Sequence, residues 1–288
     1  MAVVYLNGRF VRVERAKVSA FDRGLSYGDG LFETMRAYSG WVFALERHLR
    51  RLREGAVQIG IPFQGELSQW RRVMSELLRR NGLQAADSSL RLTLTRGNDP
   101  LGSLLPPETP PSPTLLLVAK SLDVGISEQQ QLGISAIALR WGSPFNPLGI
   151  KSLNYLYNML ALAQARREGA QEALFVATDG SVVEGTTSNL FSVSRGILTT
   201  PPVASGLLPG ITREVVIELA RKEGLAVRDA SLPLDDLLSA DEAFVTGSLK
   251  EVMPLTEVDG RKIGAGSPGP ATRLLQKRYR AAVEEERR

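Results

Sequence analysis

Hydrophobic and polar positions follow two different periods along this chain, and together they predict a mixture of strands and helices. Residues 31–38 alternate between apolar and other side chains, which is typical of a half-buried strand. In residues 46–59 apolar side chains recur every three or four positions, which predicts a helix with one buried face. Near the start, Asn7-Gly8 stands between two apolar runs, and this dipeptide favours a tight hairpin.

The same patterns predict elements along the whole chain and two domains. Further strands are expected at 3–6, 10–13, 41–45, 90–95, 114–119, 173–177, 181–183, 190–193, 197–199 and 242–245, and helices at 70–80, 153–168, 212–223, 234–238 and 271–285. Residues 120–131 are polar and predict an interdomain linker. The expected architecture is therefore α/β (α+β), with an N-terminal α+β domain at 1–119 and a C-terminal α/β domain at 132–288. A cleft between two such domains is a natural ligand site.

The composition limits the chemistry that this fold carries. The chain has 288 residues, 43% hydrophobic and 23% charged, which is typical of a globular protein large enough for two cores. It has no cysteine, which excludes disulfides and thiolate metal sites. Its one histidine leaves little material for a histidine-rich metal site or a Ser-His-Asp triad. We therefore expect no metal.

Charge and hydropathy indicate the partners. The net charge is +4, but the arginines are scattered among glutamates, so we expect small anions rather than nucleic acid as ligands. The first residues lack the pattern of a signal peptide, and the apolar runs are too short to cross a membrane. These features predict a cytoplasmic protein that binds no membrane.

Lys151 lies at an unusual boundary. Ser152 is a plausible N-cap for a helix from Leu153, so the lysine precedes the positive end of that helix dipole, where an ammonium group is disfavoured. In one interpretation the side chain reaches solvent and its stem covers apolar surface. In the other, Lys151 supplies an amine for Schiff-base or base chemistry.

Two further features belong with a reactive amine. Glu184 ends a predicted strand and precedes a loop of small residues that allows a ligand to approach, although a surface turn is the simpler reading. Gly210 precedes Thr212, which we expect to cap a helix. The backbone N–H groups at a helix start favour phosphate, although an ordinary capped helix has the same pattern. A lysine, an acid and a phosphate cradle are together what pyridoxal phosphate requires.

These blocks carry a family resemblance over nearly the whole chain. The segments YLNGRFV, DRGLSYGDGLFETMRAY, ERHLRRL, IKSLNYLYN, EGTTSNLF, LLPGITRE and VTGSLKEV occur in an order and spacing that resemble the class IV aminotransferases, the fold-type IV pyridoxal-phosphate enzymes. This family includes branched-chain and D-amino-acid aminotransferases and 4-amino-4-deoxychorismate lyase. The resemblance implies pyridoxal 5'-phosphate as cofactor, a homodimer, and an active site between the two domains.

The resemblance also implies roles for individual residues. Lys151 looks like the catalytic lysine that forms the aldimine, and Glu184 looks like the partner of the pyridinium nitrogen. Arg51 matches the arginine that binds the phosphate, for which its bidentate fork is suited. Arg50 is turned by about 100° from that face of the helix. His48 is similar to a family histidine that we interpret as structural.

The remaining implied cofactor contacts are weaker matches. They are Ile211 and Thr212 at the helix start, Gly247 and Ser248 in a second loop, and Tyr155, which would reach the phenolic oxygen. The reaction implied is ping-pong transamination between an amino acid and a 2-oxo acid. The first alternative is aminodeoxychorismate lyase, which eliminates pyruvate with the same lysine and gives 4-aminobenzoate. A non-enzymatic anion-binding module is the third possibility.

The substrate is the point where the resemblance weakens. Thr34 stands where branched-chain enzymes usually carry glycine, and Phe32-Glu33-Thr34 is more like the bacterial lyases. Residues 94–100 resemble the Thr-Arg-Gly stretch of the D-amino-acid enzymes but lack the arginine and histidine that usually follow. They also lack the glycine-arginine run common in the lyases. The candidates for binding a substrate carboxylate are Arg96, Arg36 and Arg140. Neither L- nor D-specificity follows from these residues.

Overall fold

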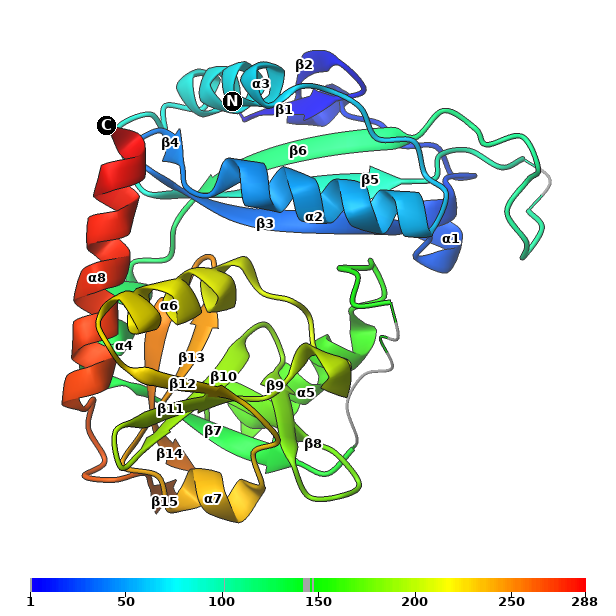
Figure 1. The fold of residues 1–288 in the computed structure, drawn as a ribbon. Helices are drawn as coiled ribbons and strands as arrows, with labels where there is room; N and C mark the ends of the chain where they lie inside the picture. The colour runs from blue at the N-terminus through cyan, green and yellow to red at the C-terminus, as the bar shows by residue number, and fades with distance from the viewer. Residues whose placement is uncertain (1, 101, 142–145, 147) are drawn as a thin grey trace. The chain divides into compact units, whose positions relative to one another are not determined.

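The computed structural model describes residues 2–100, 102–141, 146 and 148–288 and divides into two compact units (Figure 1). The first unit comprises Met1–Leu122 with the short segment Ile150–Asn154, and the second comprises Asp123–Gly149 with Tyr155–Glu286. Each unit combines a β-sheet with helices. The predicted mixed α/β fold is therefore confirmed.

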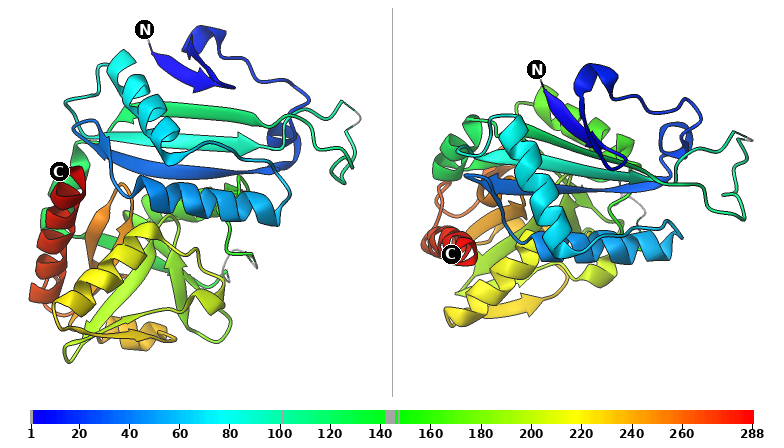
Figure 2. Two further views of the ribbon diagram at one scale, coloured as in Figure 1. Left: turned by 45° about the horizontal axis from the view of Figure 1, so that its top comes forward. Right: turned by 90° about the horizontal axis from the view of Figure 1, so that it is seen from above.

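The first unit is built on a six-stranded sheet in the order β2-β1-β6-β5-β3-β4, with every neighbouring pair antiparallel. Its strands are β1 (Val3–Leu6), β2 (Arg9–Arg12), β3 (Gly30–Tyr38), β4 (Trp41–Val42), β5 (Ser88–Thr95) and β6 (Thr114–Ser121). Its helices are α1 (Arg23–Tyr27), α2 (Leu45–Gln58) and α3 (Leu67–Arg80), with a short 3-10 turn at Val13–Arg15. Figure 2 shows α2 and α3 against this sheet.

One apolar core joins α2 and α3 to the sheet. Leu49 and Leu52 of α2 and Met74 of α3 lie in the same buried cluster as Leu31 and Met35 of β3. Side chains two positions apart on a strand share a face, so the residue between Leu31 and Met35 on this face is Glu33. The sequence therefore places one carboxylate in an apolar stripe that α2 covers.

The second unit contains a nine-stranded mixed sheet. Its strands are β7 (Ile134–Leu139), β8 (Glu172–Val176), β9 (Val182–Gly185), β10 (Asn189–Ser194), β11 (Ile197–Thr200), β12 (Ala226–Asp229), β13 (Glu242–Gly247), β14 (Glu251–Val258) and β15 (Arg261–Lys262). The order is β12-β11-β10-β13-β14-β7-β8-β9, with β15 paired to β14. The pairs β11–β12, β14–β7 and β7–β8 are parallel and the others antiparallel.

Five helices and a short 3-10 turn complete the second unit. The helices are α4 (Gly125–Leu132), α5 (Leu156–Arg167), α6 (Ile211–Lys222), α7 (Leu234–Leu238) and α8 (Pro270–Arg287), and the 3-10 turn is Val203–Ser205. Buried leucines of α7 pack with apolar side chains of β8, β10 and β14, while alanines of α5 pack on β7 and β8. These contacts fix the strand ends from which the candidate site residues project.

The structure differs from the predicted domain boundaries in two places. The range 120–131, expected as a linker, contains the end of β6 and most of α4, because its polar glutamines belong to a helix with only one residue buried, Gln130. The predicted C-terminal domain, 132–288, includes the catalytic lysine. In the structure its segment, Ile150–Asn154, belongs with the first unit, because it pairs with a strand there.

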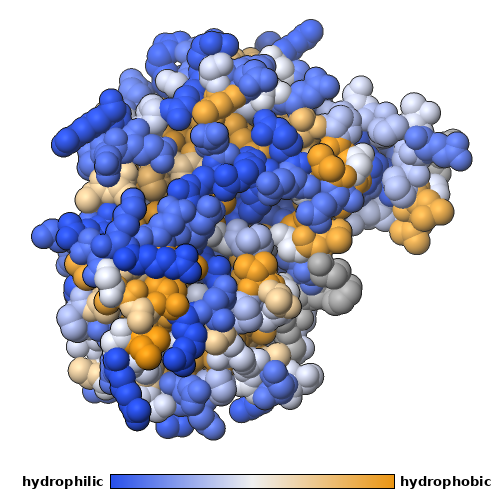
Figure 3. Space-filling model, in the orientation of Figure 1, coloured by the Kyte–Doolittle hydropathy of each residue, from blue (hydrophilic) through white to orange (hydrophobic). Residues whose placement is uncertain are grey.

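The visible surface is mainly hydrophilic. Figure 3 shows hydrophilic side chains over most of one face, with hydrophobic ones in small separate groups. Among the helices formed by the described residues, none has the length and apolar content needed to cross a membrane.

Candidate active site

Lys151 is held on the edge of β3 in the first unit. The Phe32 N–H donates to the Lys151 carbonyl at 2.9 Å, and the Leu153 N–H donates to the Gly30 carbonyl at 3.0 Å. Ser152 forms an antiparallel bridge with Leu31. Lys151 Nζ lies 4.5 Å from the centroid of the Phe32 ring. The backbone on both sides of the amine is therefore fixed by a buried strand.

This placement corrects the predicted helix start. Helix α5 begins at Leu156, with Tyr155 as its N-cap residue, and not at Leu153. Ser152 forms a bridge with Leu31, and the Leu153 N–H bonds to the Gly30 carbonyl, so neither residue belongs to the helix. Lys151 therefore does not lie at the end of a helix dipole. The amine instead lies against an aromatic ring and near other cations.

Glu33, His48 and Arg51 form a buried charge cluster in the first unit. Glu33 is 1% exposed and lies on β3, opposite His48 and Arg51 of α2. Arg51 donates to both carboxylate oxygens, from Nε at 2.8 Å and from a terminal nitrogen at 2.8 Å. His48 Nδ1 lies 2.7 Å from Glu33 Oε2. The bidentate geometry fixes the plane of the arginine fork.

The cluster perturbs both titratable members. Burial alone would raise the pKa of Glu33, but the charge of Arg51 and the bonds from His48 and Arg51 outweigh it and lower the pKa to about 2. Burial lowers the pKa of His48, and the charges of Arg51 and Lys151 act in the same direction against the stabilising Glu33. A neutral His48 therefore donates from Nδ1 to the carboxylate. The effect of Lys151 on His48 shows that the amine belongs to the same electrostatic neighbourhood.

Glu184 is oriented by two donors in the second unit. It lies at the end of β9, where its carboxylate accepts from Asn189 Nδ2 and from the Leu208 N–H, both at 3.2 Å. Asn189 Nδ2 also donates to the Leu208 carbonyl at 2.9 Å. The amide therefore joins β9 to the segment that leads into α6, and holds the acid in one orientation.

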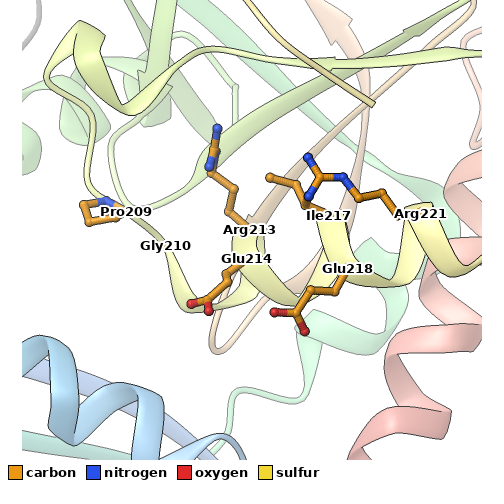
Figure 4. Close-up of a pocket in the computed structure, with 7 residues that line it drawn as sticks. All are labelled: Pro209, Gly210, Arg213, Glu214, Ile217, Glu218 and Arg221. Carbon is orange, nitrogen blue, oxygen red and sulfur yellow. The ribbon is translucent and has the colours of Figure 1, made fainter. Parts of the chain in front are cut away.

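The start of α6 has the features of an anion cradle. Gly210 is the N-cap residue and no side chain caps the helix, so Thr212 is not the predicted cap but a buried residue of the first turn. A Cβ atom at Gly210 would stand 1.9 Å from Asn189 Oδ1, so only glycine fits. A hollow of about 260 Å³ opens along this helix, lined by Pro209, Gly210, Arg213, Glu214, Ile217, Glu218 and Arg221 (Figure 4). Uncapped N–H groups at a helix start favour phosphate.

A second cradle lies at the end of β13. Thr246 is 1% exposed, and its hydroxyl has no hydrogen-bond partner within the described part of the chain. Gly247 and Ser248 follow in the turn toward β14. A Cβ atom at Gly247 would stand 3.2 Å from the Thr187 carbonyl, so a side chain there would crowd the loop after Glu184.

Comparison with known proteins decides the family. The sequence pattern of the amino-transferase class IV family matches residues 30–258, which is most of the chain. The chain belongs to the class IV aminotransferases. This class IV aminotransferase is 42% identical to a putative branched-chain-amino-acid aminotransferase of Methanocaldococcus jannaschii, covering 96% of this chain and 95% of the relative. It is 36% identical to the D-alanine aminotransferase of Bacillus licheniformis, covering 95% and 94%. It is 32% identical to the aminodeoxychorismate lyase of Bacillus subtilis, covering 98% and 95%.

Solved structures agree with this membership. The branched-chain amino acid aminotransferase of Escherichia coli superimposes with a TM-score of 0.90 at 32% identity, covering 98% of this chain and 94% of that one. A hypothetical aminotransferase of Mycobacterium tuberculosis in its pyridoxal-phosphate-bound form gives a TM-score of 0.86 at 27% identity, covering 99% and 100%. The fold-type IV prediction is confirmed, and the non-enzymatic alternative is excluded by the family.

The cofactor of the family is pyridoxal phosphate, and the residues of this class IV aminotransferase fit it. An uncapped helix start after Gly210 and the unpartnered hydroxyl of Thr246 suit phosphate oxygens. Glu184 supplies a fixed carboxylate, and Lys151 an amine with a fixed backbone. On the described residues, no cluster of three or more metal-binding side chains accompanies them.

The three candidate arginines for a substrate carboxylate differ in their surroundings. All three nitrogens of Arg96 bond within the first unit, to Asp29 and to the carbonyls of Ile59 and Gly60, so the structure argues against a role in substrate binding. Arg36 donates to Asp87 at 2.7 Å and stacks on the Tyr38 ring. Arg140 is exposed at the end of β7. The sequence does not distinguish these arginines, because it does not show which groups each of them contacts.

Two buried acids were missed by sequence reasoning. Glu33 could have been found, because it is the one charged position in the stripe from Leu31 to Ala37 that faces α2. Glu172, at the start of β8, has no comparable signal, because an acid at the end of an apolar run is usually exposed.

Proposed function

We propose that this protein moves an amino group between an amino acid and a 2-oxo acid by a ping-pong reaction that uses Lys151. The observation that carries the proposal is the position of Lys151. Its backbone is bonded to β3, and its charge acts on His48 of the Glu33–His48–Arg51 cluster. A backbone held on both sides of the amine limits its movement, and Arg51 already has a fixed fork. Family membership supports the reaction class.

Each cofactor contact then has a proposed role. Bound pyridoxal phosphate supplies an aldehyde that combines with amino groups and a ring that accepts electrons. Arg51 and the N–H groups of Ile211 and Thr212 bind its phosphate, with Gly247 and Ser248 in the second loop. Tyr155 is proposed to reach the phenolic oxygen.

The protein's own groups move and hold the protons. Lys151 would hold the cofactor through its side-chain amine, and the same amine, when free, would accept and return the proton of the substrate carbon. Glu184, held by Asn189 and Leu208, keeps the proton on the ring nitrogen. No histidine is required for a transfer, because His48 is occupied by Glu33.

For the amino donor we propose a branched-chain amino acid. The support is that the relative at 42% identity is named for that substrate, against 36% for one named for D-alanine and 32% for one named as a lyase. Thr34, on β3, is the residue that weighs toward the lyase alternative.

Replacement of Lys151 tests the reaction. We expect Lys151→Ala to lower kcat by about 10²- to 10⁴-fold, because one amine both links the cofactor and moves the proton. Purified wild-type protein should be yellow, and borohydride should attach the cofactor to the peptide that contains Lys151. Lys120→Ala, an exposed lysine at the end of β6, is the matched control and should keep full activity. A colourless protein that binds no added cofactor would refute the proposal.

A substrate panel separates the alternatives. L-Leucine, L-valine and D-alanine are supplied with 2-oxoglutarate, and aminodeoxychorismate is supplied in parallel. Turnover of L-leucine and L-valine supports the branched-chain proposal. Turnover of D-alanine alone would contradict the branched-chain proposal but keep transamination. Turnover of aminodeoxychorismate alone would contradict transamination itself.

We also propose a homodimer, supported by the exposed apolar face of α5. Leu156, Met159 and Leu160 are 67%, 62% and 52% exposed and lie at helical spacing on one face with Ala163. Such a face is costly to leave in water. Sedimentation should show a dimer, and Met159→Glu should shift it toward monomer. A wild-type monomer with full activity would contradict the proposal.

A further inference from the structure

Glu172 is a fully buried carboxylate that the proposed chemistry does not use. It begins β8 and is 0% exposed. It accepts hydrogen bonds from the hydroxyls of Thr186 and Ser188, the latter at 2.9 Å, and from the N–H groups of Ala173 and Thr186, both at 3.1 Å. Lys250 Nζ lies 2.5 Å from its second oxygen. So many donors to one carboxylate indicate that it is held ionised for a structural purpose.

The Lys250 ammonium helps to keep Glu172 ionised. Burial alone would raise the pKa of Glu172, but the Lys250 ammonium and the hydrogen bonds from Lys250, Thr186 and Ser188 outweigh it, so its pKa lies below the usual range. Lys250 is 26% exposed at its side chain, whereas Glu172 has no contact with solvent. The lysine thus reaches inward from the surface to an acid that no water reaches.

Glu172 fixes the connection between β9 and β10, residues 186–188. The Gly185 N–H donates to the Ser188 carbonyl at 2.8 Å, which closes the turn, and Asn158 Nδ2 of α5 donates to the Thr186 carbonyl at 2.8 Å. A Cβ atom at Gly185 would stand 2.4 Å from Ser188 Oγ, so the turn is closely packed. Glu184, the proposed partner of the ring nitrogen, lies immediately before this turn.

Lys250 belongs to the turn that carries Ser248. Its Nζ also donates to Thr187 Oγ1 at 3.1 Å, so it contacts the connection 186–188 as well as Glu172. Its carbonyl accepts from Gln130 Nε2 at 2.9 Å, and Gln130 also donates to Glu251 at 3.0 Å. Glu251 has a φ of 56°, a left-handed conformation that a non-glycine residue keeps only when its surroundings hold it.

We propose that Lys250 is a positioning residue that ties the connection after Glu184 to the Ser248 turn through buried Glu172, and so sets the geometry of cofactor binding. The inference rests on the proposed function for the roles of Glu184 and Ser248. In this role Lys250 acts through Glu172 and Thr187 rather than by direct contact with substrate or cofactor. Its removal separates two loops that must keep a fixed spacing to hold opposite ends of one small molecule.

The experiment compares pyridoxal-phosphate binding in three variants. Cofactor-free wild type, Lys250→Met, Lys250→Arg and Lys222→Met are titrated with pyridoxal phosphate and followed by absorbance, and each is melted without cofactor. We expect Lys250→Met to raise the Kd about tenfold, the size found when support for a bound group is removed. Lys250→Arg should restore binding to within about threefold, because its fork still reaches a carboxylate. Lys222→Met, an exposed lysine of α6, should bind as wild type.

The outcomes separate this inference from the proposed function. A wild type that binds no pyridoxal phosphate overturns the proposed function. A wild type that binds, with a Lys250→Met that binds equally well, overturns the positioning role, even where the melting temperature of that variant falls. If Lys250→Met does not fold, the pair Glu172→Gln/Lys250→Met leaves no unpaired buried charge. Weakened binding in the folded pair supports the role, and wild-type affinity overturns it.

Discussion

Two of the buried acids of this protein, Glu33 and Glu172, are compensated in different ways. Each begins or interrupts an apolar strand, each is at most 1% exposed, and each has a nearby cation. Glu33 is satisfied by side chains alone, with both oxygens on Arg51 and one also on His48. Glu172 is satisfied mainly by two hydroxyls and one backbone N–H of the turn 186–188 and by the Ala173 N–H of its own strand, and Lys250 reaches it from the surface.

The difference shows what each carboxylate holds in place. A bidentate pair fixes the orientation of one guanidinium, so Glu33 serves the side chain of Arg51. A carboxylate that accepts from main-chain N–H groups fixes a backbone, so Glu172 serves a turn. Both arrangements leave an uncompensated charge if one partner is lost, but the consequence differs with the exposure of that partner.

The largest expected effect comes from removal of Glu33. Glu33→Ala should lower the free energy of unfolding by about 3–5 kcal/mol, because it leaves the Arg51 guanidinium, whose side chain is 11% exposed, without its partner. Urea denaturation measures the change. Glu54→Ala, an exposed acid of the same helix, is the control and should stay within about 0.5 kcal/mol of wild type. A loss below about 1 kcal/mol for Glu33→Ala would show that the cluster is not closely coupled to the fold.

Lowering the pH should reveal how much the Glu33–Arg51 ion pair contributes to the stability of the wild-type protein. The pKa of Glu33 is about 2 in the folded state against an ordinary value of 4.5, so its contribution is complete above pH 4.5 and is lost as the pH falls toward 2. The contribution amounts to about 3 kcal/mol, since one pKa unit corresponds to about 1.4 kcal/mol. Stability is measured by urea denaturation at steps between pH 6 and 3. Glu33→Gln should show a flatter decline than wild type or Glu54→Gln, and parallel curves would contradict the assignment.

A smaller effect is expected at the second acid. Glu172→Gln should lower the free energy of unfolding by about 1–2 kcal/mol. The amide keeps an oxygen that accepts from the turn, and the partly exposed Lys250 ammonium can be solvated by water. Urea denaturation of Glu172→Gln beside Glu33→Gln measures the contrast directly. Equal losses in the two variants would remove the distinction between an acid that orients a side chain and one that fixes a turn.

The sequence predicted the fold class and the residue types of the candidate site, but not their local surroundings. The helical period of 46–59 located α2 to within a residue at each end, because a strongly amphipathic pattern has one solution. The helix expected from Leu153 starts at Leu156, because the backbones of Ser152 and Leu153 pair with β3 instead. No local signal announces such a pairing, since its partner lies far away in the sequence.

The same limit explains the arginines. Arg51 stands among other arginines of a predicted helix and Arg96 follows a predicted strand, and neither sequence context shows which acid the arginine binds. Arg96 proves to be bound by Asp29 and two carbonyls, and Arg51 by Glu33. Which arginine has a fixed orientation depends on strands and turns that come together only in the folded chain. The helical phase did separate Arg50, which is exposed, from Arg51, which is not.

The pairing of the Lys151 segment with β3 also affects the order in which the chain folds during synthesis. The strands and helices up to β6 contain the whole sheet of the first unit, yet the edge of β3 receives its last hydrogen bonds from Ile150–Asn154, which is synthesised much later. Contacts between distant parts of a chain form slowly, because a long loop must close first. We therefore expect the early sheet to form before Lys151 arrives. Lys151, on which the proposed reaction depends, reaches its position only when its segment pairs with β3. A chain that ends before Lys151 would therefore keep the folded sheet but lack the reactive amine.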